Sequence, residues 1–198
     1  MRNAIFFGMI FSGLCFAQNY EYIGTYKCKN CHKKDEMGAQ YKVWEKAAHS
    51  KAFETLGSDK AKGIAKERGI EGSPQESAEC LGCHTVGFGK GGYEVKDKAF
   101  WEPAPDDKEG LKAVKRMESL QGVGCESCHG PGSEYESKKT MTAIFEGKAK
   151  PEDHGLLIPN EETCLGCHNE KSPTFTPFDY KERLKKIAHP YPEGVKKS

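Results

Sequence analysis

Residues 122–132 read Gly-Val-Gly-Cys-Glu-Ser-Cys-His-Gly-Pro-Gly and contain the pattern Cys-x-x-Cys-His at 125–129. The same pattern returns at residues 28–32, 80–84 and 164–168. It is the attachment signature of a c-type haem, because two thiols on one turn of chain can reach the two vinyl groups of one porphyrin. The histidine that follows is then directed at the iron as its proximal ligand. The four motifs predict four covalently bound haem c groups and a protein that transfers electrons.

The motif side chains are the predicted cofactor-binding residues. The thioether positions are Cys28, Cys31, Cys80, Cys83, Cys125, Cys128, Cys164 and Cys167. The proximal iron ligands are His32, His84, His129 and His168. Zinc ribbons also pair Cys-x-x-Cys units, but they do not require a histidine directly behind each pair, as is found here at all four. A thioredoxin-like redox pair is excluded because no βαβ pattern surrounds any motif.

The first residues indicate export from the cytoplasm. A positive charge at Arg2 precedes an apolar stretch over residues 4–16, which ends at the small residue Ala17. This pattern is typical of a secretory signal peptide, here residues 1–17. Its removal takes away Cys15 and leaves eight cysteines, all of which belong to the motifs. We therefore expect a periplasmic protein, with an extracellular location as the variant, and no transmembrane segment in the mature chain.

The mature chain, residues 18–198, has the length of a single domain. The sequence is 36% hydrophobic and 30% charged, with 22 glycines and 10 prolines. A chain this polar would bury too little apolar side chain to offset its conformational entropy. We therefore expect a compact, mainly α-helical fold with extensive loops that wraps around four haems, which form most of its core.

Charge points to protein partners rather than to nucleic acid. The formal net charge is +1, and the haem propionates are expected to make the complete protein acidic. Lysine-rich stretches lie at residues 60–66, 108–115 and 181–186. They either neutralise propionates, face an acidic patch on a partner, or form solvated helix faces. The expected partners are a redox donor and a redox acceptor.

Hydrophobic periodicity and helix breakers predict the local structure. A Gly-rich turn is expected at residues 87–92, followed by an irregular segment or short strand at residues 93–107. Helices are expected at residues 35–56, 59–68, 108–120, 133–145 and 179–188.

Three histidines lie outside the motifs, namely His49, His154 and His189. Each is a candidate sixth ligand, because imidazole suits haem iron and four irons each need one. Three such ligands cannot serve four irons, so one haem takes a thioether or keeps an open iron. An open iron could bind a small molecule and would be the place of any enzymatic role. The candidate thioethers are Met37, Met117 and Met141.

Four segments extend the motifs, namely Trp44-x4-His49-x3-Phe53, residues 80–84 with 87–93, residues 122–132, and residues 176–178 before the helix that leads to His189. These segments resemble the tetrahaem cytochrome c-554 family, partners of hydroxylamine oxidoreductase in ammonia oxidisers. The resemblance covers nearly all of the mature chain. It implies stacked haem pairs, periplasmic electron transfer and bis-His ligation of three haems, with His49 and His189 as distal ligands. It also implies a five-coordinate haem at His84.

The chain departs from that family at one position. Many relatives place a histidine shortly after the Gly-Pro-Gly of the third motif, where this chain has Tyr135. The next histidine here is His154, the remaining candidate for a third distal ligand. If it does not bind iron, a second haem lacks its sixth ligand.

Three functions compete at this point. The first is an electron carrier, since bis-His haems are saturated and suited to relaying charge. The second is a reductase of nitric oxide, hydroxylamine or a related small nitrogen species at the His84 haem, for which Tyr93 and Arg116 are candidate polar groups. The third is a subunit of an extracellular cytochrome filament. We expect the carrier, with no catalytic residue.

Overall fold

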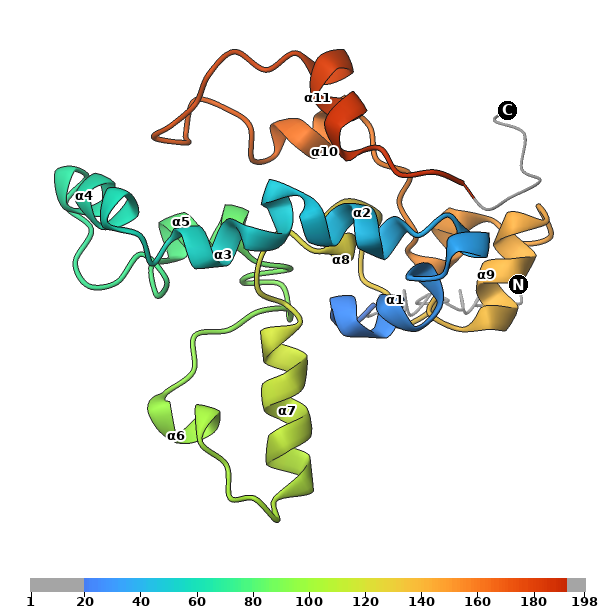
Figure 1. The fold of residues 1–198 in the computed structure, drawn as a ribbon, viewed down its shortest axis with the longest axis horizontal. Helices are drawn as coiled ribbons and strands as arrows, with labels where there is room; N and C mark the ends of the chain where they lie inside the picture. Colours follow the sequence, from blue (N-terminus) through green and yellow to red (C-terminus); the bar gives the residue numbers. More distant parts are fainter. Residues whose placement is uncertain (1–19, 192–198) are drawn as a thin grey trace, which may run out of the picture.

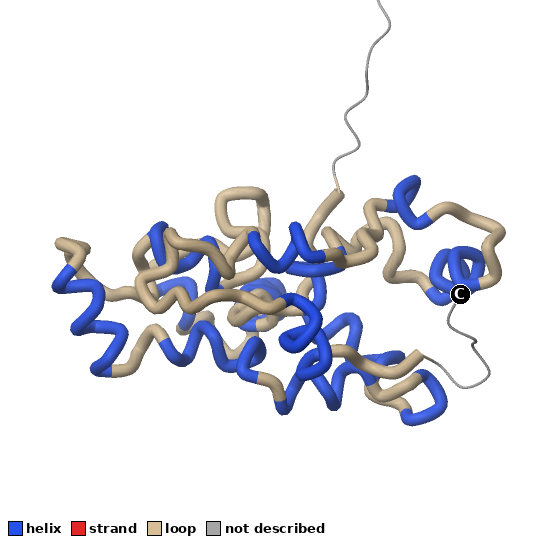
Figure 2. Tube along the Cα trace, turned by 90° about the horizontal axis from the view of Figure 1, so that it is seen from above, coloured by secondary structure: helices blue, strands red, loops and turns tan. Residues whose placement is uncertain are grey.

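The structure is a computed structural model that describes residues 20–191. The predicted signal peptide, residues 1–17, lies outside the described residues. The described chain consists of helices and loops, and its β-structure is limited to one antiparallel bridge between Thr85 and Gln121 (Figure 2). No helix within residues 20–191 is both long and apolar enough to cross a membrane. The expected mainly α fold with extensive loops is confirmed.

The helices are short and follow one another in this order. They are α1 (Thr25–His32), η1 (Asp35–Met37), α2 (Gln40–Lys46), η2 (Ala48–Lys51), α3 (Ala52–Thr55), α4 (Asp59–Glu67), α5 (Ala78–His84), α6 (Lys98–Trp101), α7 (Lys108–Glu118), α8 (Cys125–His129), α9 (Lys138–Phe145), η3 (Pro151–His154), α10 (Glu161–Leu165) and α11 (Tyr180–Ile187).

The helices form a central row with an outgrowth on each of two opposite sides (Figure 1). Helices α2 and α3 run along the middle, where α1 contacts α2 and α8, and α3 contacts α5. Helices α6 and α7 pack together as an arm that leaves the row on one side. Helices α10 and α11 lie on the opposite side, connected by a long loop.

The predicted helix over residues 35–56 is wrong in one respect, because it is divided into four pieces. Gly38 and Ala39 adopt positive φ angles of 93° and 49° and separate η1 from α2. Ala47 is extended and ends α2. The carbonyl of His49 then accepts a hydrogen bond from the Val123 N–H at 2.9 Å. Contact with the third-motif loop therefore overrides the helical periodicity and places His49 in η2.

The predictions of α4, α7 and α11 are confirmed to within two residues at each end. Each helix begins at a side-chain cap that accepts a hydrogen bond from a backbone N–H of the first turn, which favours helix formation. The caps are Ser58, Asp107 and Asp179. Two other segments differ from prediction. The helix expected from residue 133 starts at Lys138, capped by Ser137, and the segment 93–107 is irregular, as one of its two alternatives had it, except for the short helix α6.

A side-chain core forms at the base of the arm. Leu81, Val86 and Leu120 are completely buried there. The aromatic side chains of Phe53, Phe100 and Trp101 pack against the same cluster. This core belongs to the half of the molecule that contains the second motif and the arm. The rest of the cluster consists of Leu56, Tyr93 and Met117.

Candidate functional site

Each Cys-x-x-Cys-His motif lies on a helical turn. The first three motif histidines, His32, His84 and His129, are the last residues of α1, α5 and α8. The fourth motif follows the same pattern one turn beyond α10, where His168 N–H donates to the Cys164 carbonyl at 3.0 Å. Cysteines three residues apart on such a turn share one face, so their thiols point to the same side.

Two motif histidines direct their Nδ1 atoms at backbone carbonyl oxygens. His84 Nδ1 lies 2.7 Å from the Ala52 carbonyl, and His129 Nδ1 lies 3.2 Å from the Leu157 carbonyl. A carbonyl oxygen can only accept a hydrogen bond, so Nδ1 carries the proton in these two rings. Nε2 then retains its lone pair, which is the arrangement that metal-binding histidines use.

The other two motif histidines are held by side chains. His32 Nδ1 lies 3.1 Å from Gln40 Oε1. The His168 ring stacks on Phe178, with ring centroids 4.6 Å apart and planes inclined by 21°. All four motif rings therefore have fixed neighbours, and Phe178 belongs to the segment 176–178 that carried part of the sequence resemblance.

Two motif histidines face a histidine from a distant segment. The ring centroids of His49 and His168 are 6.0 Å apart, and those of His129 and His189 are also 6.0 Å apart. Metal–imidazole nitrogen bonds are about 2.0–2.1 Å, so an iron bound between two rings separates their centroids by about 6 Å. Both spacings fit an iron between the rings.

Burial favours the neutral form of these imidazoles. It lowers the pKa of His49 and of His189 below the ordinary value, and the neighbouring His168 and His129 lower them further. Burial also lowers the pKa of His129, against the opposing effect of the Leu157 carbonyl. A ligating imidazole must be neutral, so these surroundings suit metal binding.

The motifs meet in pairs that do not follow the sequence order. The thiol of Cys28 in the first motif is hydrogen-bonded to that of Cys125 in the third. The thiol of Cys83 in the second motif is hydrogen-bonded to that of Cys167 in the fourth, which lowers the pKa of Cys83 to about 6. The first motif is thus adjacent to the third, and the second to the fourth.

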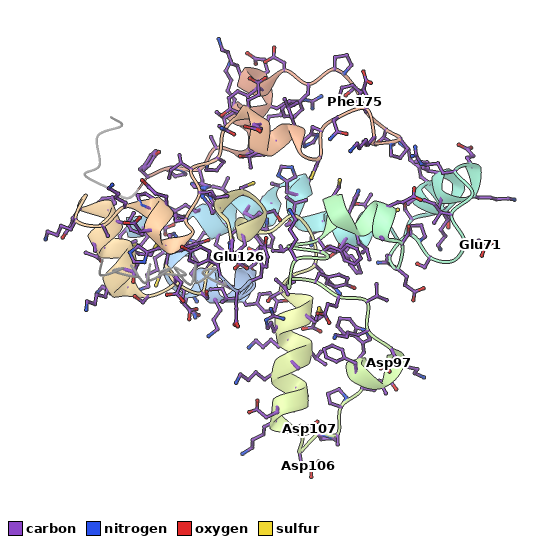
Figure 3. All side chains as sticks on the ribbon, turned by 180° about the vertical axis from the view of Figure 1, so that it is seen from behind. Glu71, Asp97, Asp106, Asp107, Glu126 and Phe175 are labelled. Atoms are coloured by element: carbon purple, nitrogen blue, oxygen red, sulfur yellow. The ribbon has the colours of Figure 1, made fainter. Side chains whose placement is uncertain are left out.

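Apolar side chains beside the third and fourth motifs are open to solvent. Leu157, whose carbonyl faces His129, is 53% exposed, and Leu165 within the fourth motif is 41% exposed. Phe175 lies on the loop between α10 and α11 and is 38% exposed (Figure 3). Exposed leucines and phenylalanines concentrated beside the motifs suit the faces of a large apolar cofactor.

Glu126 lies inside the third motif, and its role in holding the motif loop was not predicted from the sequence. The residue is 2% exposed, and its carboxylate accepts hydrogen bonds from the backbone N–H groups of Ile23 at 2.9 Å, Gly24 at 2.7 Å and Gly132 at 2.7 Å. Burial raises the pKa of Glu126, and the three N–H groups oppose that rise. Glu126 therefore ties the start of the described chain to the third-motif loop near the centre of the molecule (Figure 3).

The remaining candidates occupy different surroundings. Tyr135 is buried, and its hydroxyl donates to the Gly130 carbonyl at 2.6 Å. Arg116 Nη2 donates to the carbonyl oxygens of Tyr22 and Gly91. His154 ends η3, and it stays a prediction that no contact tests.

The three candidate methionines also lie in different parts of the fold. Met117 lies in the side-chain core, where its sulfur accepts a hydrogen bond from the Glu94 N–H. Met37 ends η1, and Met141 lies on α9. Within residues 20–191, no three His, Cys, Asp or Glu side chains are grouped so that they could hold a metal ion by themselves, as a tetrahedral zinc site would require.

Comparison with known proteins gives consistent matches. The family model described as cytochrome c554 and c-prime matches residues 27–102 and 102–130. Cytochrome c-554 of Nitrosomonas europaea is 33% identical over 185 residues, which cover 84% of this chain and 69% of that protein. The structure of the reduced state of cytochrome c554 from Nitrosomonas europaea superimposes with a TM-score of 0.52 and 29% identity. That superposition covers 85% of this chain and 78% of the other.

Proposed function

This chain belongs to the cytochrome c554 family, and we propose that it is a periplasmic carrier with four haem c groups that relays electrons between two redox proteins. Membership of the family makes it a c-type cytochrome with covalently bound haem that takes part in electron transfer with redox partners. The number of haems, their ligands and the periplasmic location are the proposal.

The observation that carries the proposal is the pair of facing histidines at each of two motifs. We assign His168 and His49 as the axial ligands of the fourth-motif haem, and His129 and His189 as those of the third-motif haem. The equal centroid separations of 6.0 Å support both assignments. Bis-His ligation leaves no free coordination position, which favours electron relay over substrate chemistry.

The first and second motifs complete the set of four. His32 and His84 are the proposed proximal ligands there. We also propose His154 as the sixth ligand of the first-motif haem. Its support is that the neighbouring Gly155 packs its carbonyl against Gly130 in the third-motif loop, and that α1 of the first motif contacts α8 of the third. The proposed haem of His84 keeps the open position.

Haem c supplies one-electron exchange at its iron when bound, and the chain's own residues determine where and how easily that occurs. The closeness of Cys28 to Cys125 and of Cys83 to Cys167 would place the haems as two close pairs. The Ala52 and Leu157 carbonyls accept hydrogen bonds from the Nδ1–H groups of His84 and His129 and make those ligands more basic, which stabilises ferric iron.

The reductase alternative receives less support. Arg116 donates to two backbone carbonyls, and the Tyr93 hydroxyl is hydrogen-bonded to Gln121. Both candidate polar groups are therefore engaged in the fold rather than aimed at a substrate. We propose a carrier without a catalytic residue.

A redox titration combined with electron paramagnetic resonance tests the proposal. We expect four one-electron steps per chain and a minority of high-spin ferric iron. His49→Met and His189→Met should each shift one midpoint to higher potential, because a Met/His haem has a higher potential than a bis-His haem. His154→Met tests the assignment of His154 as a sixth ligand in the same way, because it should also shift one midpoint to higher potential. Fewer than four steps, or unchanged midpoints in the His49 and His189 variants, would overturn the assignments.

A further inference from the structure

Gln40, the first residue of α2, contacts three parts of the chain through one side-chain amide. Its Oε1 lies 3.1 Å from His32 Nδ1. Its Nε2 donates to the Met37 carbonyl and, at 3.1 Å, to the carbonyl of Pro190. The amide therefore joins the first motif, the turn before α2 and the segment directly after His189.

The two carbonyl partners fix the orientation of this amide. A carbonyl oxygen cannot donate, so the NH₂ group must face Met37 and Pro190, and the amide oxygen must face His32. The imidazole therefore donates from Nδ1, and its Nε2 keeps the lone pair. His32 thus depends on a side chain for the tautomer that a backbone carbonyl sets for His84 and for His129.

Gly38 makes this arrangement sterically possible. Its φ of 93° lies in the region that favours glycine, and a Cβ built there would come within 2.5 Å of the Pro190 carbonyl oxygen. The same Cβ would lie 2.8 Å from Gln40 Nε2. The turn before α2 therefore has the shape that lets the segment after His189 reach the Gln40 amide.

We propose that Gln40 is a positioning residue for His32, and that it lowers the potential of the first-motif haem by accepting a hydrogen bond from Nδ1–H. This inference rests on the proposed function, because it assumes a haem on the first motif. An acceptor at Nδ1 makes the imidazole more basic and stabilises ferric iron. Because the acceptor is a side chain, this potential can be changed in both directions by substitution.

Gln40→Leu and Gln40→Glu separate this role from a structural one. Both variants lose the hydrogen bonds to the Met37 and Pro190 carbonyls. Any change of midpoint potential that acts through the segment near His189 should therefore have the same sign in Gln40→Leu and Gln40→Glu. Leucine also removes the acceptor, whereas a carboxylate is a stronger acceptor. We expect one midpoint to rise in Gln40→Leu and to fall in Gln40→Glu. A tenfold change in the ratio of reduced to oxidised haem corresponds to about 59 mV.

Redox titration of the complete cytochrome gives the readout, and Gln75→Leu is the matched control. Gln75 donates to the Phe53 carbonyl, on a different part of the chain from Gln40 and its three partners. The Gln75→Leu substitution should leave unchanged the haem midpoint potential that shifts in the Gln40 variants. Midpoints that stay fixed, or that move in the same direction in both Gln40 variants, would overturn the inference.

The haem count by mass spectrometry keeps the two proposals distinguishable. Four haems with unresponsive midpoints contradict only the role of Gln40. A first motif without haem contradicts the proposed function itself.

Discussion

The base of the arm and the region of the third and fourth motifs are built in different ways. At the base of the arm, Leu81 and Leu120 are completely buried within a cluster of apolar side chains. In the motif region, Leu157 and Leu165 are largely open, and the close contacts are histidine pairs and hydrogen bonds to backbone. The first region is held by side-chain packing. In the motif region, the chain leaves its apolar side chains open, as expected if haem groups supply the apolar surface that packs against them.

Removing one haem should have the largest effect. Cys125→Ala with Cys128→Ala eliminates the third-motif attachment, and with it the haem proposed between His129 and His189. We expect protease cleavage to increase strongly in residues 125–191 and much less in α7. Limited proteolysis followed by mass spectrometry measures both. An equal increase of cleavage in residues 125–191 and in α7 would show that the motif region does not depend on haem more than the arm does.

Leu120→Ala tests the packed region. A completely buried leucine replaced by alanine should lower the free energy of unfolding by about 2–5 kcal/mol. Leu111→Ala is the control, because Leu111 is 45% exposed on α7 and should change stability by less than about 0.5 kcal/mol. Denaturant titration of both haem-loaded variants gives the comparison. Equal losses would mean that the cluster is not a core.

Glu126→Gln tests the junction between the two regions. The amide can present only one acceptor oxygen to three backbone N–H groups and brings an NH₂ group against them. We expect a loss of about 1–3 kcal/mol in the free energy of unfolding, the cost of leaving buried donors unsatisfied. Glu134→Gln, an exposed change in the same loop, should have almost no effect. An unchanged free energy of unfolding in Glu126→Gln would contradict the proposal that Glu126 stabilises the contact between Gly24 and Gly132.

The smallest effect is expected at the tip of the arm. Asp107 caps α7 by accepting from the Gly110 N–H at 2.9 Å, whereas the adjacent Asp106 does not cap a helix (Figure 3). Asp107→Ala should cost about 1 kcal/mol, and Asp106→Ala should cost less. Thermal unfolding of the two variants measures the difference. Identical unfolding temperatures would contradict the capping role.

The two regions also differ in how far sequence could predict them. Helix α7 follows from its capping aspartate and its local pattern, and the motifs follow from spacing alone. The break between α2 and η2 could not be predicted, because it goes with a hydrogen bond from Val123, which is distant in sequence, whereas Gly38 gives a local signal for the earlier break. The pairing of His49 with His168 is equally a property of the folded chain.

Gln40 and Glu126 show why part of the site escapes sequence reasoning. Neither residue belongs to a metal-binding pattern, and both act through backbone groups or rings that only the fold brings near. The local signal for Glu126 is its position between the two cysteines of a motif, which predicts no partner. The signal for Gln40 is its place at the start of a helix, which predicts none either.

The central claim is that four covalently bound haems take the place of side-chain packing in the motif region. The intact mass of the protein secreted by a host that attaches haem c tests it most directly. We predict the mass of residues 18–198 plus four haem additions, with the eight motif cysteines resistant to alkylation after denaturation. A folded product with fewer than four haems, or with alkylatable motif cysteines, would contradict it.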